Sequence, residues 1–180
     1  VIPSFKEPDL IGALESINAC QYPSGKMLVI VVLNEAENAS QAIKKANSKT
    51  LSDLQKFVCD YPLLVTQKKF PSKKAGVGLA RKIGMDEALR LFKKIDKDGA
   101  IVCFDADCRC DTNYLNKIER AYADETTQAG VVFYEHHLHR DNHEAIVDYE
   151  LYLRYYIDAL RYAQFPYAHQ TLGSCITVRA

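Results

Sequence analysis

The run MLVIVVL, from Met27 to Leu33, is short, continuously apolar and rich in β-branched residues. Such a run is typical of a strand that is covered on both faces, as in a parallel sheet. Outward from it, predicted strands alternate with predicted helices. The other predicted strands are VIPS at the start, LLVT (63–66), AIVCF (100–104), VVFY (131–134) and the closing GSCITVRA.

Helical patterns fill the segments between these strands. Leu10, Leu14 and Ile17 recur at helical spacing, and residues 79–95 form a strongly amphipathic segment. The predicted helices cover 8–20, 41–58 with Ser40 as N-cap, 79–95, 112–123 and 144–164. Strands alternating with helices predict an α/β fold with a mostly parallel central sheet.

Composition narrows the classes of function. The 180 residues are 48% hydrophobic and 26% charged, and 23 basic residues cancel 23 acidic ones. This is globular composition, which excludes a disordered or collagen-like chain. Because the net charge is zero, no overall field attracts nucleic acid, and we expect no nucleic-acid partner. No run approaches the roughly 18 apolar residues of a membrane span. The six cysteines predict free, buried thiols in a reducing compartment.

Two carboxylates, Asp105 and Asp107, leave the fourth predicted strand. Ligands of open α/β sheets bind beyond the carboxyl ends of strands, and an i, i+2 spacing lets both side chains aim at one point. Paired carboxylates repel one another unless a cation neutralises them. Mg²⁺ takes one or two carboxylates and completes its shell with substrate phosphate oxygens. We therefore predict a Mg²⁺ or Mn²⁺ site here. The alternative is that Asp105 caps the next turn and Asp107 is solvated.

The segment KKAGVGLAR places Lys74 and Gly76 where the helix over 79–95 begins. Glycines there let backbone N–H groups approach a phosphate closely. The spacing matches neither common phosphate-loop motif, so a solvated lysine loop is the alternative interpretation.

Four segments, in order along the chain, resemble inverting family 2 glycosyltransferases. Residues 1–17 (VIPSFKEPDLIGALESI) resemble the opening VIPxxNE strand and helix. Residues 73–89 (KKAGVGLARKIGMDEAL) resemble the NxGxxxARNxGxxxA helix, and residues 101–118 (IVCFDADCRCDTNYLNKI) resemble the hhhhDxD strand with its following helix. The closing GSCITVRA is similar to the acceptor-side GxxxxxRR strand.

This resemblance implies a GT-A fold, which is a Rossmann-like three-layer α/β/α sandwich. A UDP- or GDP-linked sugar would lie across the carboxyl edge of the sheet, and a hydroxyl of a glycan or lipid-linked acceptor would attack it with inversion. Asp107 and Asp105 would bind the metal. The donor would be bound by Pro3, Glu7, Asn34, Glu35, Lys74, Gly76, Arg81 and Asp105, and the acceptor side would include Gly173, Ser174 and His136.

The resemblance also sets the expected organisation. Residues 1–134 would form the nucleotide-sugar-binding core, and residues 135–180 would begin the acceptor-side region. Both ends of the sequence fall in predicted strands, so we expect a piece of a longer protein. The family's general base, an Asp beyond the GxxxxxR segment, would then lie past Ala180. A cytoplasmic location, at most peripheral to the inner membrane, and polysaccharide or glycoconjugate synthesis are also implied.

Two departures from the family pattern stand out. The family's DDGSxD run is replaced by LNEAEN, which leaves Asn34, Glu35 and Glu37 as substitutes, and Lys6 stands where Asn is common. Three other functions stay open. A haloacid-dehalogenase-like phosphatase would use Asp105 as nucleophile and Asp107 as acid and base. A sugar nucleotidylyltransferase would need an early glycine-rich loop that VIPSFKEP lacks. The third is a catalytically silent nucleotide-sugar-binding domain.

Two features near the end of the chain lie outside these motifs. The loop EHHLHRDNHE contains His136, His137, His139 and His143. We expect it to line the acceptor cleft rather than to bind metal, and His136 or His139 is a candidate contact for the diphosphate. The tyrosine-rich helix over 144–164 is expected to pack in the core, with sugar stacking or partner docking as alternatives.

Overall fold

The strand that contains most of the MLVIVVL run is central to the fold in the computed structural model, which describes residues 1–138 and 143–180. The described elements are β1 (Ile2–Ser4), α1 (Leu10–Asn18), β2 (Val29–Ala36), α2 (Gln41–Lys56), β3 (Leu63–Phe70), α3 (Val77–Ile95), β4 (Ala100–Val102), α4 (Tyr114–Tyr122), β5 (Ala129–Val131), α5 (His143–Tyr162) and β6 (Ile176–Arg179). Ser40 caps α2 as predicted, because its side chain accepts a hydrogen bond from Ile43 N.

Strands β1, β2 and β3 form a parallel sheet in that order. Both β2 and β3 run further than predicted, because residues 34–36 pair with residues 68–70. The basic segment QKKF, which lies beyond the predicted strand over 63–66, is therefore part of β3. Gln67, Lys68 and Lys69 are polar, but their backbone groups are satisfied by the ladder with β2, and Phe70 is buried.

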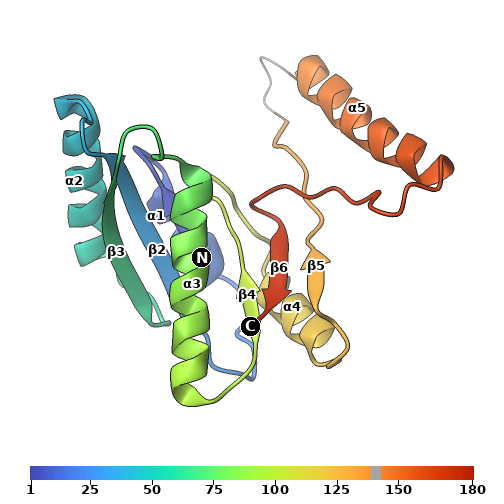
Figure 1. Ribbon diagram of the computed structural model, residues 1–180, viewed down its shortest axis with the longest axis horizontal. Helices are drawn as coiled ribbons and strands as arrows, with labels where there is room; N and C mark the ends of the chain where they lie inside the picture. The colour runs from blue at the N-terminus through green and yellow to red at the C-terminus, as the bar shows by residue number, and fades with distance from the viewer. Residues whose placement is uncertain (139–142) are drawn as a thin grey trace.

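Helices cover both faces of this sheet (Figure 1). Val31 and Leu33 pack with α1 and α2, whereas Ile30 and Val32 pack with α3. This alternation follows from the two-residue period of a strand. Val31 and Val32 are fully buried, and each such burial contributes about 1.5–3 kcal/mol. The α/β prediction is confirmed, with helices on both faces of the parallel sheet.

The remaining strands form a second, antiparallel sheet of order β4-β6-β5. The prediction of a mostly parallel sheet therefore holds for β1–β3 and fails for this part. Val1 joins the two sheets: Val1 N donates to Val102 O at 2.6 Å, and Phe104 N donates to Val1 O at 3.0 Å. This is the bonding pattern of parallel neighbours. The carboxyl ends of β1–β4 consequently meet at one edge.

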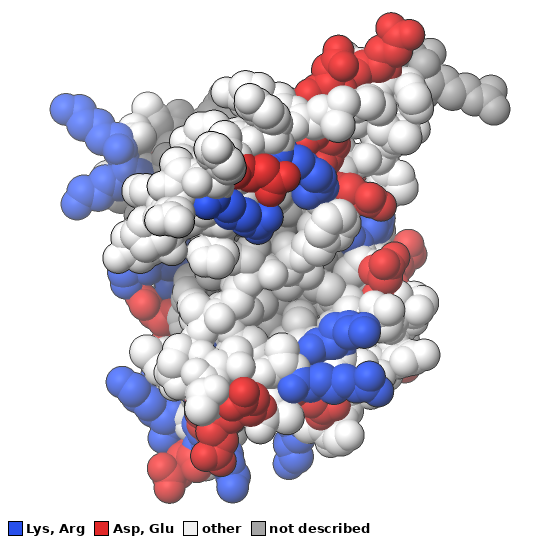
Figure 2. All heavy atoms as spheres, turned by 90° about the vertical axis from the view of Figure 1, so that its right-hand side faces the viewer, with Lys and Arg blue, Asp and Glu red and all other residues white. Residues whose placement is uncertain are grey.

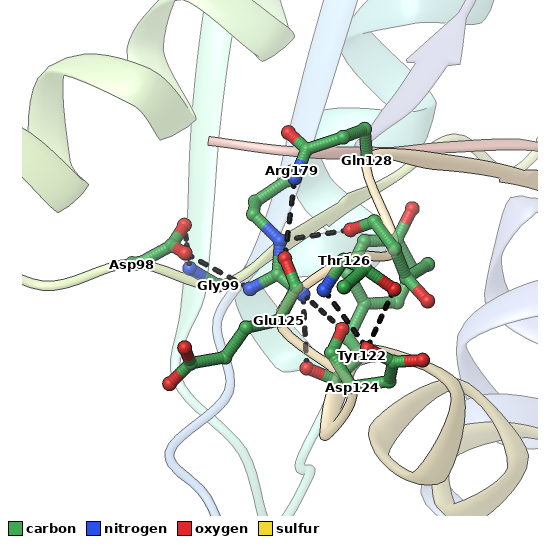
Figure 3. Close-up of polar contacts among 9 residues, drawn as sticks. Asp98, Gly99, Tyr122, Asp124, Glu125, Thr126, Gln128 and Arg179 are labelled. Atoms are coloured by element: carbon green, nitrogen blue, oxygen red, sulfur yellow. Dashed lines mark hydrogen bonds and ion pairs between the residues drawn. The ribbon is translucent and has the colours of Figure 1, made fainter.

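Arg179 anchors the last strand at the opposite edge (Figure 3). Its guanidinium is 14% exposed and pairs with Asp98 at 2.9 Å. It also donates to the carbonyl oxygens of Tyr122, Asp124 and Thr127. One side chain thus ties β6 to the start of β4 and to the turn between α4 and β5.

Helix α5 projects from the body of the molecule (Figure 1), and Ile157 is its buried residue. The aromatic residues of this region that were predicted to pack in the core are instead exposed, from 49% at Phe165 to 93% at Tyr162; the others are Tyr149, Tyr152, Tyr155 and Tyr156. The core-packing prediction is wrong in the described structure. The division of the chain at residue 134 stays a prediction.

Surface charge is mixed in sign. On the face drawn in Figure 2, Lys and Arg side chains alternate with Asp and Glu around a mostly uncharged centre. All six cysteines are free thiols; Cys20, Cys103 and Cys175 are buried as predicted, whereas Cys59, Cys108 and Cys110 are only partly buried. Within residues 1–138 and 143–180, the structure contains no helix with the length and apolar character needed to cross a membrane.

Candidate functional site

The loops that follow β1 and β4 enclose a pocket of about 200 Å³ at the carboxyl edge. Four of its lining residues were predicted from the sequence as site residues, although they come from segments a hundred positions apart. The pocket is lined by Pro3, Phe5, Glu7, Val77, Asp105, Ala106 and Asp107. The opening motif and the DxD motif are therefore neighbours in space.

A tight turn presents the two aspartates to this pocket. Cys108 N donates to Asp105 O at 3.2 Å, which closes the turn. Ala106, between the two acids, is 6% exposed and belongs to the core cluster under α1. Because Ala106 points into the core, the flanking carboxylates are left outside it, and Asp107 is solvent-exposed.

Asp105 forms an ion pair with Arg81 of α3. The Nη2 to Oδ1 distance is 2.6 Å, and the two side chains are 15% and 34% exposed. The Arg81 Nε atom is buried without a hydrogen-bond partner. The structure thus brings together two residues that the sequence assigned to the donor.

Gly173 lies against the guanidinium of Arg81. A Cβ atom at position 173 would clash with that group. Because β6 is antiparallel to β4, the segment before β6 returns to the edge that carries Asp105. Gly173, which was predicted on the acceptor side, is therefore adjacent to the ion pair between Arg81 and Asp105. Ser174 Oγ, next to it, lies 3.6 Å from Cys175 Sγ.

Asn47 of α2 connects the loop after β1 with the last residues of β2. Lys6 adopts a positive φ of 52°, and its backbone N donates to Asn47 Oδ1 at 3.1 Å. Asn47 Nδ2 donates to Asn34 O at 3.0 Å. Asn47 was missed in the sequence. The available signal was a polar residue on the buried face of an amphipathic helix, in register with Thr50 and Leu54.

Asn34 and Glu35 lie near the end of β2 and do not line the pocket. Asn34 is 3% exposed, and its Nδ2 atom has no hydrogen-bond partner. Glu35 contacts Lys69 at 3.6 Å and accepts from Asn47 at 3.4 Å. The polar groups that replace the family's DDGSxD run are thus close to the loop that follows β1, with Asn47 between them.

Helix α3 begins at Val77, which lines the pocket. Gly76 is the N-cap with an extended φ of 172°, and a Cβ there would meet open space. Contacts within the protein therefore do not require glycine at this position. Lys74 is exposed, and its backbone N donates to Pro71 O at 2.7 Å.

His136 is held by α5. Its Nδ1 lies 2.6 Å from Glu150 Oε1, and Arg154 donates to the other Glu150 oxygen at 2.8 Å. Although burial acts to raise the pKa of Glu150, the hydrogen bonds from His136 and the charge of Arg154 lower it overall. His136 is not among the residues lining the pocket. His139 lies outside the described residues.

The donor set at the pocket fits a hard divalent cation. Asp105 and Asp107 offer carboxylate oxygens to the same space, and Mg²⁺ or Mn²⁺ accepts such oxygens together with phosphate oxygens and water. At the pocket and throughout the described part of the chain, no group of three His, Cys, Asp or Glu side chains could hold a metal, so a cation here would have two carboxylate ligands from the protein. Burial and nearby carboxylates raise the pKa of the Cys108 thiol to about 11.

A larger hollow of about 690 Å³ lies on the outer side of α1 and α2. Ile11, Asn18, Lys56 and Phe57 are among its lining residues, and none of its lining residues was predicted as a site residue. We assign the candidate site to the smaller pocket, because the paired carboxylates and the start of α3 meet there.

Comparisons with protein-family models, with curated proteins and with solved structures found no match for this chain. The interpretation of the site therefore depends on its own chemistry and on the sequence resemblance.

Proposed function

We propose that this chain is the nucleotide-sugar-binding part of an inverting glycosyltransferase with a GT-A fold. The observation that carries the proposal is that Pro3, Glu7, Asp105 and Asp107 line one pocket at the carboxyl ends of β1 and β4. Two motifs that the resemblance places around one donor are thereby adjacent. The parallel sheet with helices on both faces supports the same interpretation.

In this proposal each group at the pocket has a chemical role. Asp107 and Asp105 would hold Mg²⁺ or Mn²⁺, which neutralises charge on a leaving diphosphate when bound. Pro3 and Glu7 would contact the nucleoside, and the guanidinium of Arg81 would bind phosphate oxygens. Because nucleotide sugars are supplied in the cytoplasm, the protein would act there, and its products would be glycans or glycoconjugates.

Titration of UDP and GDP into the protein, with and without Mn²⁺, tests this proposal. We expect Mn²⁺-dependent binding of one nucleotide and at least a tenfold loss of affinity in Asp107→Asn, since a neutral amide is a poor cation ligand. Asp86→Asn is the matched control, because it removes an exposed carboxylate on α3 that pairs with Lys82. Its affinity should equal that of the unsubstituted protein.

The alternatives give different results in the same samples. A phosphatase of the haloacid-dehalogenase type would release phosphate from a phosphomonoester without nucleotide and would form an aspartyl-phosphate at Asp105. Nucleotide binding that is unaffected by Mn²⁺ and by Asp107→Asn would contradict the metal site. A silent binding domain would bind the nucleotide but transfer no sugar in the longer protein.

A further inference from the structure

Arg81 already pairs with the carboxylate of Asp105, which the proposed cation would use as a ligand. Its Nη2 lies 2.6 Å from Asp105 Oδ1, and the side chains are 15% and 34% exposed. The electrostatic attraction within a partly buried pair is screened less than that within a fully exposed pair. The charge of Asp105 is thus already offset without a metal. A cation approaching the same carboxylate alone meets a fixed positive charge within a few ångströms.

Two features lie against the guanidinium in this position. The backbone of Gly173 lies so close that an added Cβ would clash with it. Asp105, on the turn after β4, holds the Nη2 atom. The Nε atom is buried and has no hydrogen-bond partner, so its N–H group can reach an anion only when the side chain moves. The planar fork of a guanidinium suits the oxygens of a phosphate.

We propose that Arg81 makes the cation and the diphosphate bind cooperatively, an inference that depends on the proposed function. The diphosphate gives the guanidinium new anionic partners and so frees Asp105 for the cation. The cation in turn neutralises Asp107 and the phosphate oxygens that face it. Because coupling between two ligands is reciprocal, each ligand strengthens binding of the other by the same factor.

The test measures Mn²⁺ binding directly, by titration with detection of free Mn²⁺ by electron paramagnetic resonance. Titrations are made without nucleotide, with saturating UDP and with saturating GDP, after subtraction of the Mn²⁺–nucleotide complexes formed without protein. The variants are Arg81→Met, which removes the charge, and Arg81→Lys, which keeps it. Arg90→Met is the matched control, because Arg90 lies on the same helix and pairs with exposed Glu87. Thermal unfolding identifies any variant that fails to fold.

We expect one nucleotide to tighten Mn²⁺ binding at least about tenfold in the unsubstituted protein and in Arg90→Met, within the usual range of coupling factors. Arg81→Met should bind Mn²⁺ alone several-fold more tightly and should lose most of the coupling. Arg81→Lys should keep a larger coupling factor than Arg81→Met.

Two results would overturn the inference while leaving the proposed function intact: Mn²⁺ binding at Asp107 that is equally tight with and without nucleotide, or the same coupling factor in Arg81→Met and the unsubstituted protein. Absence of any Mn²⁺ and nucleotide binding in the folded protein would instead overturn the proposed function, and the inference with it.

Discussion

At the scale of single residues, Gly173 brings the returning segment before β6 against Arg81, the ion-pair partner of Asp105. Its neighbour is the far end of a flexible side chain, the guanidinium of Arg81. In Gly173→Ala the added methyl group must displace that guanidinium, and rotation of the long side chain makes the displacement inexpensive. We therefore expect the free energy of unfolding to fall by about 1 kcal/mol or less. The displaced guanidinium of Arg81 should, however, move away from Asp105.

The measurement is nucleotide affinity in the presence of Mn²⁺, together with the free energy of unfolding in urea. Gly173→Ala should weaken nucleotide binding about five- to tenfold. Gly25→Ala is the matched control, because its Cβ would make an ordinary contact with Glu119 at 3.6 Å, far along the chain from the pocket residues. Equal affinities in the two variants would contradict the role of Gly173.

Some residues of the candidate site could be predicted from the sequence, and others could not. Asp105 and Asp107 could be predicted because their spacing after an apolar run has a direct physical meaning. Arg81 was placed near the donor, but its ion pair with Asp105 could not be predicted, because it depends on how α3 packs across β4. Asn47 was missed because its partners are backbone groups of a distant loop and of the end of β2.

At the scale of elements, the sequence predicted which segments form strands more reliably than where each strand ends and with which strand it pairs. The end of β2 was placed too early, since Asn34 and Glu35 are polar yet pair with β3. The antiparallel direction of β6 leaves no trace in local composition. It results from a chain that leaves the sheet at the end of β5 and re-enters it at the same edge, where Val131 pairs with Ile176.

The pairing of β6 also predicts an acid-sensitive contact. Arg179, at the end of β6, pairs with Asp98, which precedes β4. The hydrogen bond from Arg179 lowers the pKa of Asp98 below its ordinary value of 3.8, with a further contribution from Gly99 N. Because the folded-state pKa is depressed, the contact contributes stability above the ordinary pKa. That contribution is lost as the pH falls through the lowered value.

Free energies of unfolding between pH 7 and pH 3 test this expectation in Asp98→Asn. The variant should be less stable than the unsubstituted protein at pH 7, and the difference should shrink as the pH falls below about 4. Asp158→Asn, which removes an exposed pair within α5, is the control and should show no such convergence. A difference that stays constant down to pH 3 would contradict the ion-pair explanation.

At the scale of the whole molecule, stability is distributed unevenly between the sheet and α5. Strand β2 is covered on both faces, and its residues from Val29 to Asn34 are at most 5% exposed. Helix α5 has one buried residue, Ile157, and a surface of exposed tyrosines. Elements with few buried apolar contacts open at a lower free energy than the core that they adjoin.

Hydrogen exchange measured amide by amide checks this difference. We expect the amides of β2 to exchange only through global unfolding, and those of α5 to exchange at least about a hundredfold faster, which corresponds to about 2.7 kcal/mol. Ile157→Ala should speed exchange in α5 while leaving β2 unchanged, because the lost contact belongs to the helix alone. Leu14→Ala, in the core under the sheet, should instead speed exchange throughout the molecule. Equal protection of α5 and β2 would mean that α5 unfolds only with the core, despite its exposed tyrosines.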